Sequence, residues 1–334
     1  MSETPRASER GGRRVVVTGA TGNVGTSLVR RLLGDPAVGS VVGVARRPPA
    51  DLGVLGAGVE WRAADVAVDD LREVFVGADA VVHLAWRIQP SRDPDGMWRV
   101  NVSGTERVLD AVVACGVPAF VQASSLAAYV PAPQGRLVGE EWPIGGVASS
   151  PYSWQKAYVE RTIDTFEARH PAIRVVRMRP TLLVKPEAVR AVRRYFAGLL
   201  LARPIAGRHL TALLTHAPLA FQILHTDDAA DAFARAALDD GAHGAFNVST
   251  DEVLGRSRPS LEAPLAFAAE ALSRLHVQPL DRGWVELFFR GPLLDSGRAK
   301  AELGWKPEHD PRQALSDTLA AARRRRGWPT PALS

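Results

Sequence analysis

The sequence predicts an α/β fold, a doubly wound parallel sheet with a smaller C-terminal lobe. The first observation behind this prediction is the apolar run Val15–Val17, which is typical of a buried strand. Glycines follow at 19, 22 and 25, the spacing that turns a strand tightly into a helix. A helix-like stretch and a second strand-like run come next, so the chain opens with the strand–helix–strand unit of a Rossmann domain.

Composition limits the classes of protein to which the chain can belong. Apolar residues make up 46% of its 334 residues and charged residues 23%, which is typical of a globular protein with a sizeable core. The formal net charge of +5 comes largely from arginines near the two ends of the chain. Because no basic stripe interleaved with aromatic residues accompanies them, we expect no nucleic-acid partner.

Metal, disulfide and membrane chemistry also lack support in the sequence. Cys115 is the only cysteine, and the eight histidines show no metal-ligand spacing. No apolar run approaches the roughly 20 residues that span a bilayer, and residues 1–13 are not followed by the apolar region of a signal peptide. We expect a cytoplasmic protein without a metal centre or a membrane partner.

The glycine turn predicts a dinucleotide site. Without side chains, backbone N–H groups can approach a pyrophosphate, and the N-terminus of the following helix, expected over 23–33, attracts its charge. The next strand, expected over 40–45, leads to Arg46 and Arg47, where an NAD-binding protein carries a carboxylate for the ribose hydroxyls. Because a guanidinium is suited to a 2′-phosphate, the arginines favour NADP over NAD. Two solvated loop arginines are the alternative.

Further strands bring polar residues to the same edge of the predicted sheet. These strands are expected over 59–62, 79–84 and 118–123. Asp65 follows the first and is a candidate acceptor for the adenine amino group, although an isolated loop aspartate is more often a turn residue. We interpret His83 in the second as a packed, hydrogen-bonded residue rather than a catalyst. The third leads to Ser124 and Ser125, at the edge where α/β folds bind ligands.

Tyr152 and Lys156 form the second informative pattern. Pro151 suits the first turn of a helix expected over 151–169, and Ser149 or Ser150 is placed to cap it. Residues four apart share one face of a helix. A phenol has a pKa of about 10 in water, and a nearby ammonium lowers that value, so the pair predicts a tunable proton donor.

With these motifs in order, the chain resembles the extended short-chain dehydrogenase/reductase family, also called the NAD-dependent epimerase/dehydratase family. The resemblance runs nearly from end to end. Its motifs are Thr18–Gly25, His83–Ala85, Asn101–Thr105, Ser124–Ser125, Tyr152 with Lys156, Arg177–Pro180, His225–Asp228 and Asp295–Pro307.

The resemblance implies roles for the site residues. Tyr152 is the general acid/base, Lys156 holds the nicotinamide ribose and biases the tyrosine, and Ser125 hydrogen-bonds the reacting oxygen. Asp227 and Asp228 are expected to cap the following helix. The expected dinucleotide contacts are Gly19, Thr21, Gly22, Asn23, Val24, Gly25, Arg46, Arg47, Asp65, Val66, Leu84, Ala85, Trp86, Asn101, Ser124, Tyr152, Lys156 and Pro180. The expected substrate contacts are Trp86, Ser125, Tyr129, Tyr152 and Thr181.

The predicted domain boundaries follow the same resemblance. The dinucleotide-binding domain is expected to comprise residues 13–180 with returning segments 222–250 and 295–308, and the substrate-binding lobe residues 181–221 and 251–294. Residues 1–12 and 327–334 are expected to be flexible termini. A homodimer is expected through helices 93–115 and 151–169, with Trp154 and Tyr158 as candidate contacts to the partner.

The chain departs from the enzymes of this family that bind nucleotide sugars, both beside the catalytic motifs and in the lobe. Leu126–Ala127 stands where dehydratases carry an Asp-Glu pair, and Arg179 precedes Pro180 where an asparagine is usual. The lobe is instead rich in apolar side chains, as core residues or as a lid, including Tyr195, Phe196, Leu199–Leu201, Leu210, Leu213, Leu214, Phe221, Trp284, Phe288 and Phe289. These departures favour an uncharged, partly hydrophobic carbonyl substrate.

The sequence therefore favours an NADPH-dependent reductase of a ketone or aldehyde, acting on a small molecule of the secondary-metabolite type. An NAD-dependent sugar-nucleotide epimerase is the alternative, although Arg46 disfavours the NAD that such an enzyme retains. A catalytically silent, cofactor-sensing protein is a third hypothesis, disfavoured because Tyr152 and Lys156 are both present.

Overall fold

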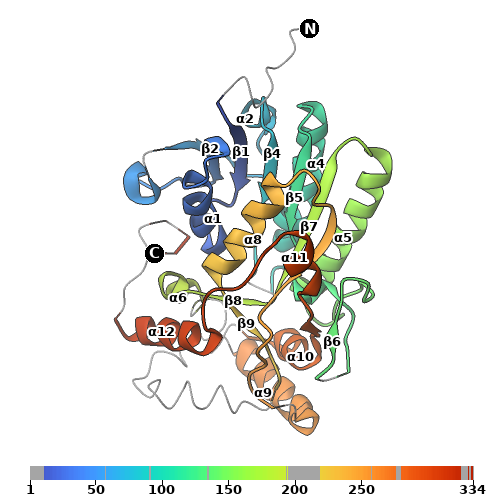
Figure 1. The fold of residues 1–334 in the computed structure, drawn as a ribbon. Coiled ribbons are helices and arrows are strands. Elements are labelled where there is room, and N and C mark those ends of the chain that lie inside the picture. Colours follow the sequence, from blue (N-terminus) through green and yellow to red (C-terminus); the bar gives the residue numbers. More distant parts are fainter. Residues whose placement is uncertain are drawn as a thin grey trace.

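A sheet of seven parallel strands forms the centre of the protein, in the order β10-β7-β5-β4-β1-β2-β3 (Figure 1). The computed structural model describes residues 11–333 except 57, 90–91, 134, 193, 195–218, 257, 276–279, 325–329 and 331. The strands of the sheet are β1 (Arg13–Thr18), β2 (Val38–Ala45), β3 (Val59–Ala63), β4 (Ala80–His83), β5 (Ala119–Ala123), β7 (Arg174–Pro180) and β10 (Gly244–Val248). The strand order reverses between β1 and β4, which is where such sheets bind ligands.

Helices cover both faces of this sheet, as the doubly wound prediction requires. Val15 and Val17 of β1 pack with α1 (Asn23–Leu33) and α8 (Thr226–Leu238). Val16, between them, faces α4 (Gly104–Ala114) and α5 (Pro151–Arg169) on the opposite side. Because successive strand residues point to opposite faces, one apolar run supplies both cores. The predicted fold class is confirmed.

The expected helices are present, with one change of geometry. The helices α1 and α5 have the predicted bounds. The stretch expected as one helix over 93–115 consists of α3 (Pro94–Trp98), a π-helical turn over Arg99–Ser103, and α4. A π-helical turn frequently accompanies a functional site, and this one carries Asn101. A short helix, α2 (Arg72–Phe75), precedes β4 in the chain.

One prediction about a helix cap is confirmed in position only, and a second is wrong. Ser150 occupies the N-cap of α5 without a side-chain cap bond, and the Ser149 hydroxyl donates instead to Glu286 at 2.6 Å. At α8 the cap is His225, whose Nδ1 accepts from the backbone N–H of Asp227 at 3.2 Å. Asp228 instead accepts from His309 Nδ1 at 2.8 Å, so this carboxylate links α8 to the C-terminal part of the chain.

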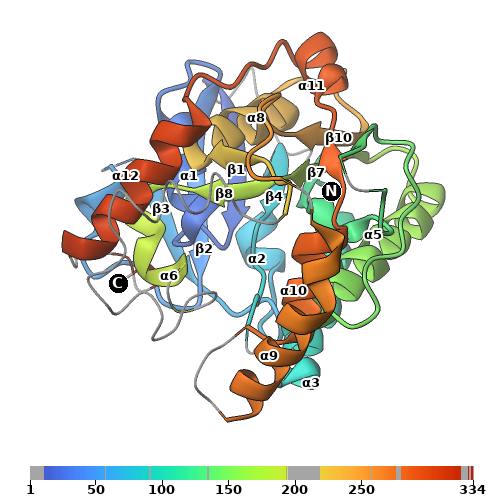
Figure 2. The same cartoon turned by 90° about the horizontal axis from the view of Figure 1, so that it is seen from below.

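The remaining elements gather at the carboxyl ends of the central strands (Figure 2). On one side lie β8 (Leu182–Val184), β9 (Ile223–His225), α6 (Val189–Val192) and α12 (Pro311–Arg324), and on the other α9 (Glu262–Arg274) and α10 (Arg282–Arg290). Two short strands, β6 (Leu137–Val138) and β11 (Leu293–Leu294), pair with each other outside the central sheet. The helix α11 (Gly297–Glu302) follows β11 in the chain. Tyr195, Phe196, Leu199–Leu201, Leu210, Leu213 and Leu214 of the predicted apolar lobe lie outside the described residues.

The two termini that the sequence predicts to be flexible differ in how much of each the structure describes. Residues 1–10 lie outside the described part of the chain. At the other end Thr330 and Leu333 are buried, 0% and 1% exposed, and the flexibility of residues 327–334 stays a prediction. Within the described residues, no helix combines the length and apolar character needed to cross a membrane.

The proposed partner-facing aromatics belong to one cluster on the protein. Tyr158 is 44% exposed, and its ring centroid lies 4.7 Å from that of Trp98. Trp154 contacts the same indole at 5.8 Å. This cluster joins α3 to α5 within one chain, and the homodimer stays a prediction.

Replacing Gly25 by alanine is expected to lower the free energy of unfolding by about 3 kcal/mol, because rigid backbone offers no room for the methyl group. A Cβ there would lie 2.3 Å from the Gly19 carbonyl oxygen. The control is Gly34→Ala, whose Cβ meets nothing nearer than 3.7 Å and which should change that free energy by less than about 1 kcal/mol. Urea denaturation measures both, and equal losses would contradict this account of the turn.

Candidate active site

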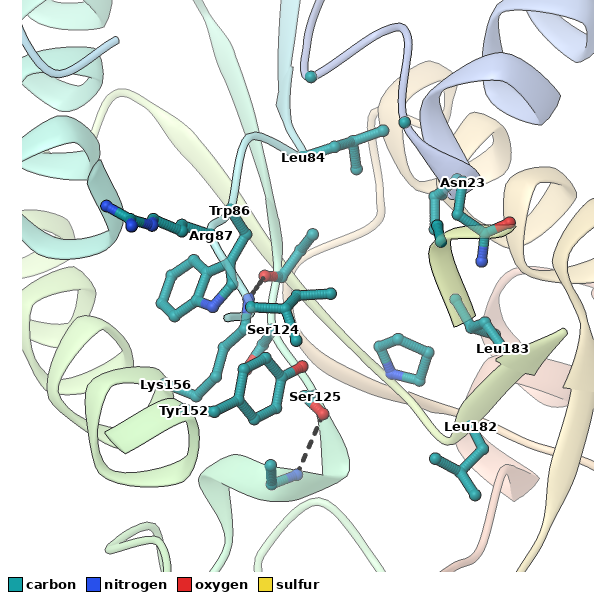
Figure 3. A pocket seen from close by; sticks show the side chains of 18 of the residues that line it. Asn23, Leu84, Trp86, Arg87, Ser124, Ser125, Tyr152, Lys156, Leu182 and Leu183 are labelled. Atoms are coloured by element: carbon teal, nitrogen blue, oxygen red, sulfur yellow. Dashed lines mark hydrogen bonds between the residues drawn. The ribbon is translucent and has the colours of Figure 1, made fainter. Parts of the chain in front are cut away.

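A cavity of about 520 Å³ follows the carboxyl ends of the central strands (Figure 3). Eighteen of the predicted residues line it, namely Gly19, Thr21, Gly22, Asn23, Val24, Gly25, Arg46, Asp65, Val66, Leu84, Ala85, Trp86, Ser124, Ser125, Tyr152, Lys156, Pro180 and Thr181. They come from six strand ends, α1 and α5, so the parallel sheet has brought distant motifs to one edge.

The glycine turn has the features of a phosphate cradle. Gly19 has φ +70°, and a Cβ on it would lie 2.8 Å from the backbone nitrogen of Ala85, so the turn lies directly against the end of β4. Gly22 is the N-cap of α1, and neither a capping side chain nor an acidic residue of the first turn occupies that end of the helix. The turn and the helix N-terminus therefore fit a pyrophosphate.

The arginines after β2 differ in position. Arg46 lines the cavity, is exposed, and has no ion-pair partner among the residues that the structure describes. Arg47 is exposed and does not line the cavity, so its contact with the dinucleotide stays a prediction. Asp65 lines the cavity and also closes a turn, because its Oδ1 accepts from the Ala67 N–H at 3.0 Å.

Ser125, Tyr152 and Lys156 converge from β5 and α5 (Figure 3). The Ser125 hydroxyl oxygen accepts from the Ala127 N–H at 3.1 Å, and the Ser125 side chain is near enough to the Tyr152 phenol to lower its pKa. Lys156 is 3% exposed, and its Nζ donates to the Ala123 carbonyl at 2.6 Å. A single surface of the cavity thus carries a phenol, an aliphatic hydroxyl and the amino group of a lysine.

The pKa of the Tyr152 phenol is raised, contrary to the prediction that the ammonium lowers it. Burial raises this pKa, and the hydrogen bond from Ser125 opposes the rise only in part. Lys156 Nζ lies 5.9 Å from the Tyr152 ring centroid and 3.4 Å from that of Trp86, so the ammonium is turned toward the indole. Burial lowers the pKa of Lys156 itself well below its usual value, while Glu160 opposes this.

A buried ion pair supports the floor of the site. Glu160 accepts from the Ser124 hydroxyl at 2.5 Å and from Arg179 Nε and Nη2, both at 2.8 Å. Burial raises the pKa of Glu160, but the hydrogen bonds from Arg179 and Ser124 and the charges of Arg179 and Arg177 together outweigh burial, so the net pKa is below the usual value. Arg179 also donates from Nη1 to the Tyr129 hydroxyl at 2.8 Å, so its guanidinium is bound within the protein.

Two further predicted contacts are corrected by the structure. Tyr129 is buried away from the cavity, where its hydroxyl donates to Asn247 at 2.8 Å, so it is not a substrate contact. Asn101 does not line the cavity either. Its side chain accepts from the Arg87 N–H at 2.7 Å and donates to the Arg87 carbonyl at 2.9 Å, which positions the loop that carries Trp86.

His83 is a packed strand residue, as predicted. Its ring is fully buried between the hydroxyls of Thr18 at 2.6 Å and Thr105 at 3.1 Å. Burial lowers the pKa of His83 to about 3. The imidazole is therefore neutral near pH 7 and has no role as an acid.

Aromatic side chains enclose the end of the cavity beside Tyr152. The Trp284 ring is stacked on the phenol at 5.1 Å between centroids, and Trp86 meets it edge-on at 6.3 Å. Phe288 contacts Trp284 at 6.0 Å and also lines the cavity, whereas the buried Phe289 does not. The indole N–H of Trp86 is buried without a hydrogen-bond partner.

Several lining residues are absent from the predicted site. They are Arg87–Gln89 of the loop after β4, Leu182 and Leu183, Ala188 and Ala191, Gln222, Leu287, Gly291–Leu293, and Ala332 with Leu333. Phe221 is expected only as an apolar residue of the lobe, and Leu126 and Ala127 only as a departure from the dehydratases. Thr181, which is predicted, lines the cavity but donates its hydroxyl to the Gln222 carbonyl at 2.9 Å. Only the three-dimensional fold brings these segments to the site.

Comparisons with known proteins agree with this geometry. The model of the NAD dependent epimerase/dehydratase family matches residues 15–249. UDP-glucose 4-epimerase of Mycolicibacterium smegmatis is 27% identical over 92% of this chain and 97% of its own. Sterol demethylase protein B of Methylococcus capsulatus is 29% identical over 93% of this chain and 98% of its own. The solved structure of MoeE5 in complex with UDP-glucuronic acid and NAD has TM-score 0.69 at 23% identity, covering 93% of this chain and 99% of that one, and this likeness concerns the fold.

The buried His83 makes stability depend on pH in a defined direction. The unfolded chain binds a proton at this residue below about pH 6.5, whereas the folded protein does so only near pH 3, so stability falls on acidification. The His83→Asn variant should lose about 2 kcal/mol less of its unfolding free energy between pH 7 and pH 5 than the parent. Urea unfolding at both pH values measures this. The exposed His243→Asn is the control, and equal losses for His83→Asn and the parent would refute the prediction.

Proposed function

This chain belongs to the NAD-dependent epimerase/dehydratase family, and from that premise we propose that it is an NADPH-dependent reductase of a ketone or aldehyde in a partly apolar small molecule. The observation that carries the proposal is the position of Ser125 and Tyr152 at the floor of a cavity whose adjoining wall is aromatic. An aromatic wall favours an uncharged, ring-bearing substrate.

The residues of the groove fit a phosphorylated dinucleotide. The glycine turn and the N-terminus of α1 would hold its pyrophosphate, and Arg46, which no carboxylate of the described chain neutralises, would bind a 2′-phosphate. MoeE5 binds NAD, so the preference for NADP rests on Arg46. When bound, the reduced nicotinamide supplies a hydride.

The chain's own groups supply the proton and the orientation. As the carbonyl carbon accepts the hydride, the Tyr152 phenol donates its proton to the carbonyl oxygen, and the Ser125 hydroxyl donates a hydrogen bond to the same oxygen. The alcohol leaves, and the tyrosine recovers a proton from solvent. A raised phenol pKa keeps Tyr152 protonated at neutral pH, the form that a reductase requires of its acid.

The electrostatics of the described cavity disfavour a diphosphate beside Tyr152. Arg179 is paired with Glu160 inside the protein, and Arg87 is paired with Asp93 at 2.9 Å. Apart from Arg87, Lys156 is the basic residue of the described chain that lines this end of the cavity. Its Nζ donates to the Ala123 carbonyl and lies over the Trp86 ring. A buried diphosphate needs more cationic partners than this.

An NAD-dependent sugar-nucleotide epimerase is the second candidate, and the relatives favour it. The similar protein of Mycolicibacterium smegmatis is a UDP-glucose 4-epimerase, and MoeE5 was solved with UDP-glucuronic acid and with NAD. An epimerase would oxidise and re-reduce the same carbon, so its cofactor would be retained and not consumed. Sterol demethylase protein B, by name, works on an apolar compound, which agrees with the first candidate.

Cofactor turnover distinguishes the two candidates. The reductase should consume NADPH in equimolar amounts with a carbonyl compound from a panel of cyclic ketones and aldehydes, followed at 340 nm. UDP-glucose should remain unchanged. Tightly bound NAD in the purified protein, together with conversion of UDP-glucose to UDP-galactose, would establish the epimerase instead. Binding of NADPH with no turnover of either kind would favour a cofactor-sensing protein.

Replacing Tyr152 by phenylalanine removes the proton donor and keeps the ring. The Tyr152→Phe variant should lose roughly 100- to 10,000-fold in kcat while its dissociation constant for NADPH stays within about threefold. The control is Tyr158→Phe, a change on the exposed part of the same helix, which should leave kcat unchanged. Normal turnover by Tyr152→Phe would rule out the assigned role.

Arg46 is expected to decide between the two dinucleotides. Arg46→Ala should raise the dissociation constant for NADPH roughly 10- to 100-fold, through loss of a charge-assisted hydrogen bond, and change that for NADH little. Arg47→Ala is the matched control, because Arg47 is exposed and outside the cavity. Fluorescence titration measures all four constants, and an unchanged NADPH affinity in Arg46→Ala would contradict the assignment.

A further inference from the structure

The last described residues of the chain return to the glycine turn. Thr330 and Leu333 follow α12 in sequence, yet Thr330 contacts the glycine turn before α1 and Leu333 packs against Ala188 and Ala191 at α6. Thr330 and Leu333 are both buried. No motif of the sequence includes these residues, and they have no role in the proposed proton transfer.

Three different parts of the protein anchor the segment. The Thr330 hydroxyl donates to the carbonyl of Thr21, within the glycine turn, at 2.9 Å. Arg194 Nη2 donates to the Ala332 carbonyl at 3.0 Å. The Leu333 side chain packs against Ala188 and Ala191.

The surface under Leu333 is itself fixed to α1. Lys185, just before Ala188, is buried, and its Nζ donates to the Asn23 carbonyl and to the Thr26 hydroxyl, both at 2.7 Å. The glycine turn, the start of α1 and the segment that receives Leu333 are therefore one connected structure.

The segment also lines the cavity. Ala332 and Leu333 border the same cavity as Gly22 and Asn23, at the end where the cradle fits a pyrophosphate. A phosphate held by the turn would lie between the N-terminus of α1 and this segment. Apolar side chains there would exclude water, which strengthens the attraction between backbone N–H groups and a phosphate.

We propose that Thr330, Ala332 and Leu333 form a clasp over the pyrophosphate half of the bound dinucleotide and slow its release. This inference rests on the dinucleotide site of the proposed function and not on the substrate. The segment is anchored by a leucine side chain and by hydrogen bonds at Thr330 and Ala332, so it can open without disturbing the sheet.

Two substitutions in the full chain test the clasp. Leu333→Asp places a charge in the apolar contact, and Thr330→Val removes the hydroxyl donor at nearly constant volume. Release of NADPH is measured by stopped-flow fluorescence after mixing with excess NADP⁺. We expect the dissociation rate constant to rise about tenfold or more in Leu333→Asp and about two- to tenfold in Thr330→Val, with little change in the association rate constant. The control is Leu265→Asp, at an exposed leucine of α9.

Unchanged dissociation in both variants overturns the proposal, even if their melting temperatures fall, because the segment then serves the fold alone. Slower release overturns it too, since the segment would then obstruct the site. The readout is independent of turnover, so the clasp stands or falls separately from the reductase. If the parent binds NADH more tightly than NADPH, the same measurement with NADH tests the clasp while the NADP preference fails. If the parent binds neither, both proposals fall.

Discussion

The burial of the Lys156 ammonium is the constraint around which the site is arranged. Removing an ammonium group from water is costly unless polar partners replace the lost hydration. Here the Ala123 carbonyl accepts a hydrogen bond from Nζ, the Trp86 ring lies over it, and Glu160 acts on it through its charge. These partners come from β5, the loop after β4, and α5 itself. Satisfying one charge therefore sets the relative positions of the elements that carry Ser125 and Tyr152.

The pairing of buried charges with each other explains why the cavity is apolar beside Tyr152. Glu160 and Arg179 neutralise each other within the protein, and the Ser124 and Tyr129 hydroxyls complete their hydrogen bonds. Little polar capacity is then left to face a ligand, and Trp284 and Phe288 occupy the wall. The proposed hydride chemistry rests on the family relationship, and the proposed substrate class rests on this wall. A relative named UDP-glucose 4-epimerase and a relative named for sterols stand at comparable identity to this chain.

The fold and the floor of the site were predictable because local patterns dictate them. The glycines after β1, the apolar alternation of the strands, and the four-residue spacing of Tyr152 and Lys156 act over short distances. Errors arose where a residue's partner is distant in sequence. Tyr129 was expected at the substrate but is bound by Asn247 and Arg179, and the pKa of Tyr152 is raised because the folded chain buries its phenol. Leu333 carries no local signal, because its burial requires Ala188 and Ala191.

The central claim, that the cavity reduces an exogenous carbonyl with a proton from Tyr152, is tested most directly by following the hydride. NADPH deuterated at the transferred position of nicotinamide C4 is incubated with the protein and the best carbonyl compound of the panel, and the product is analysed by mass spectrometry and NMR. The account predicts one deuterium on the new carbinol carbon for each NADP⁺ formed. Retention of the label on the cofactor without a labelled alcohol, together with inversion of the sugar carbinol in a parallel incubation with UDP-glucose, would contradict it.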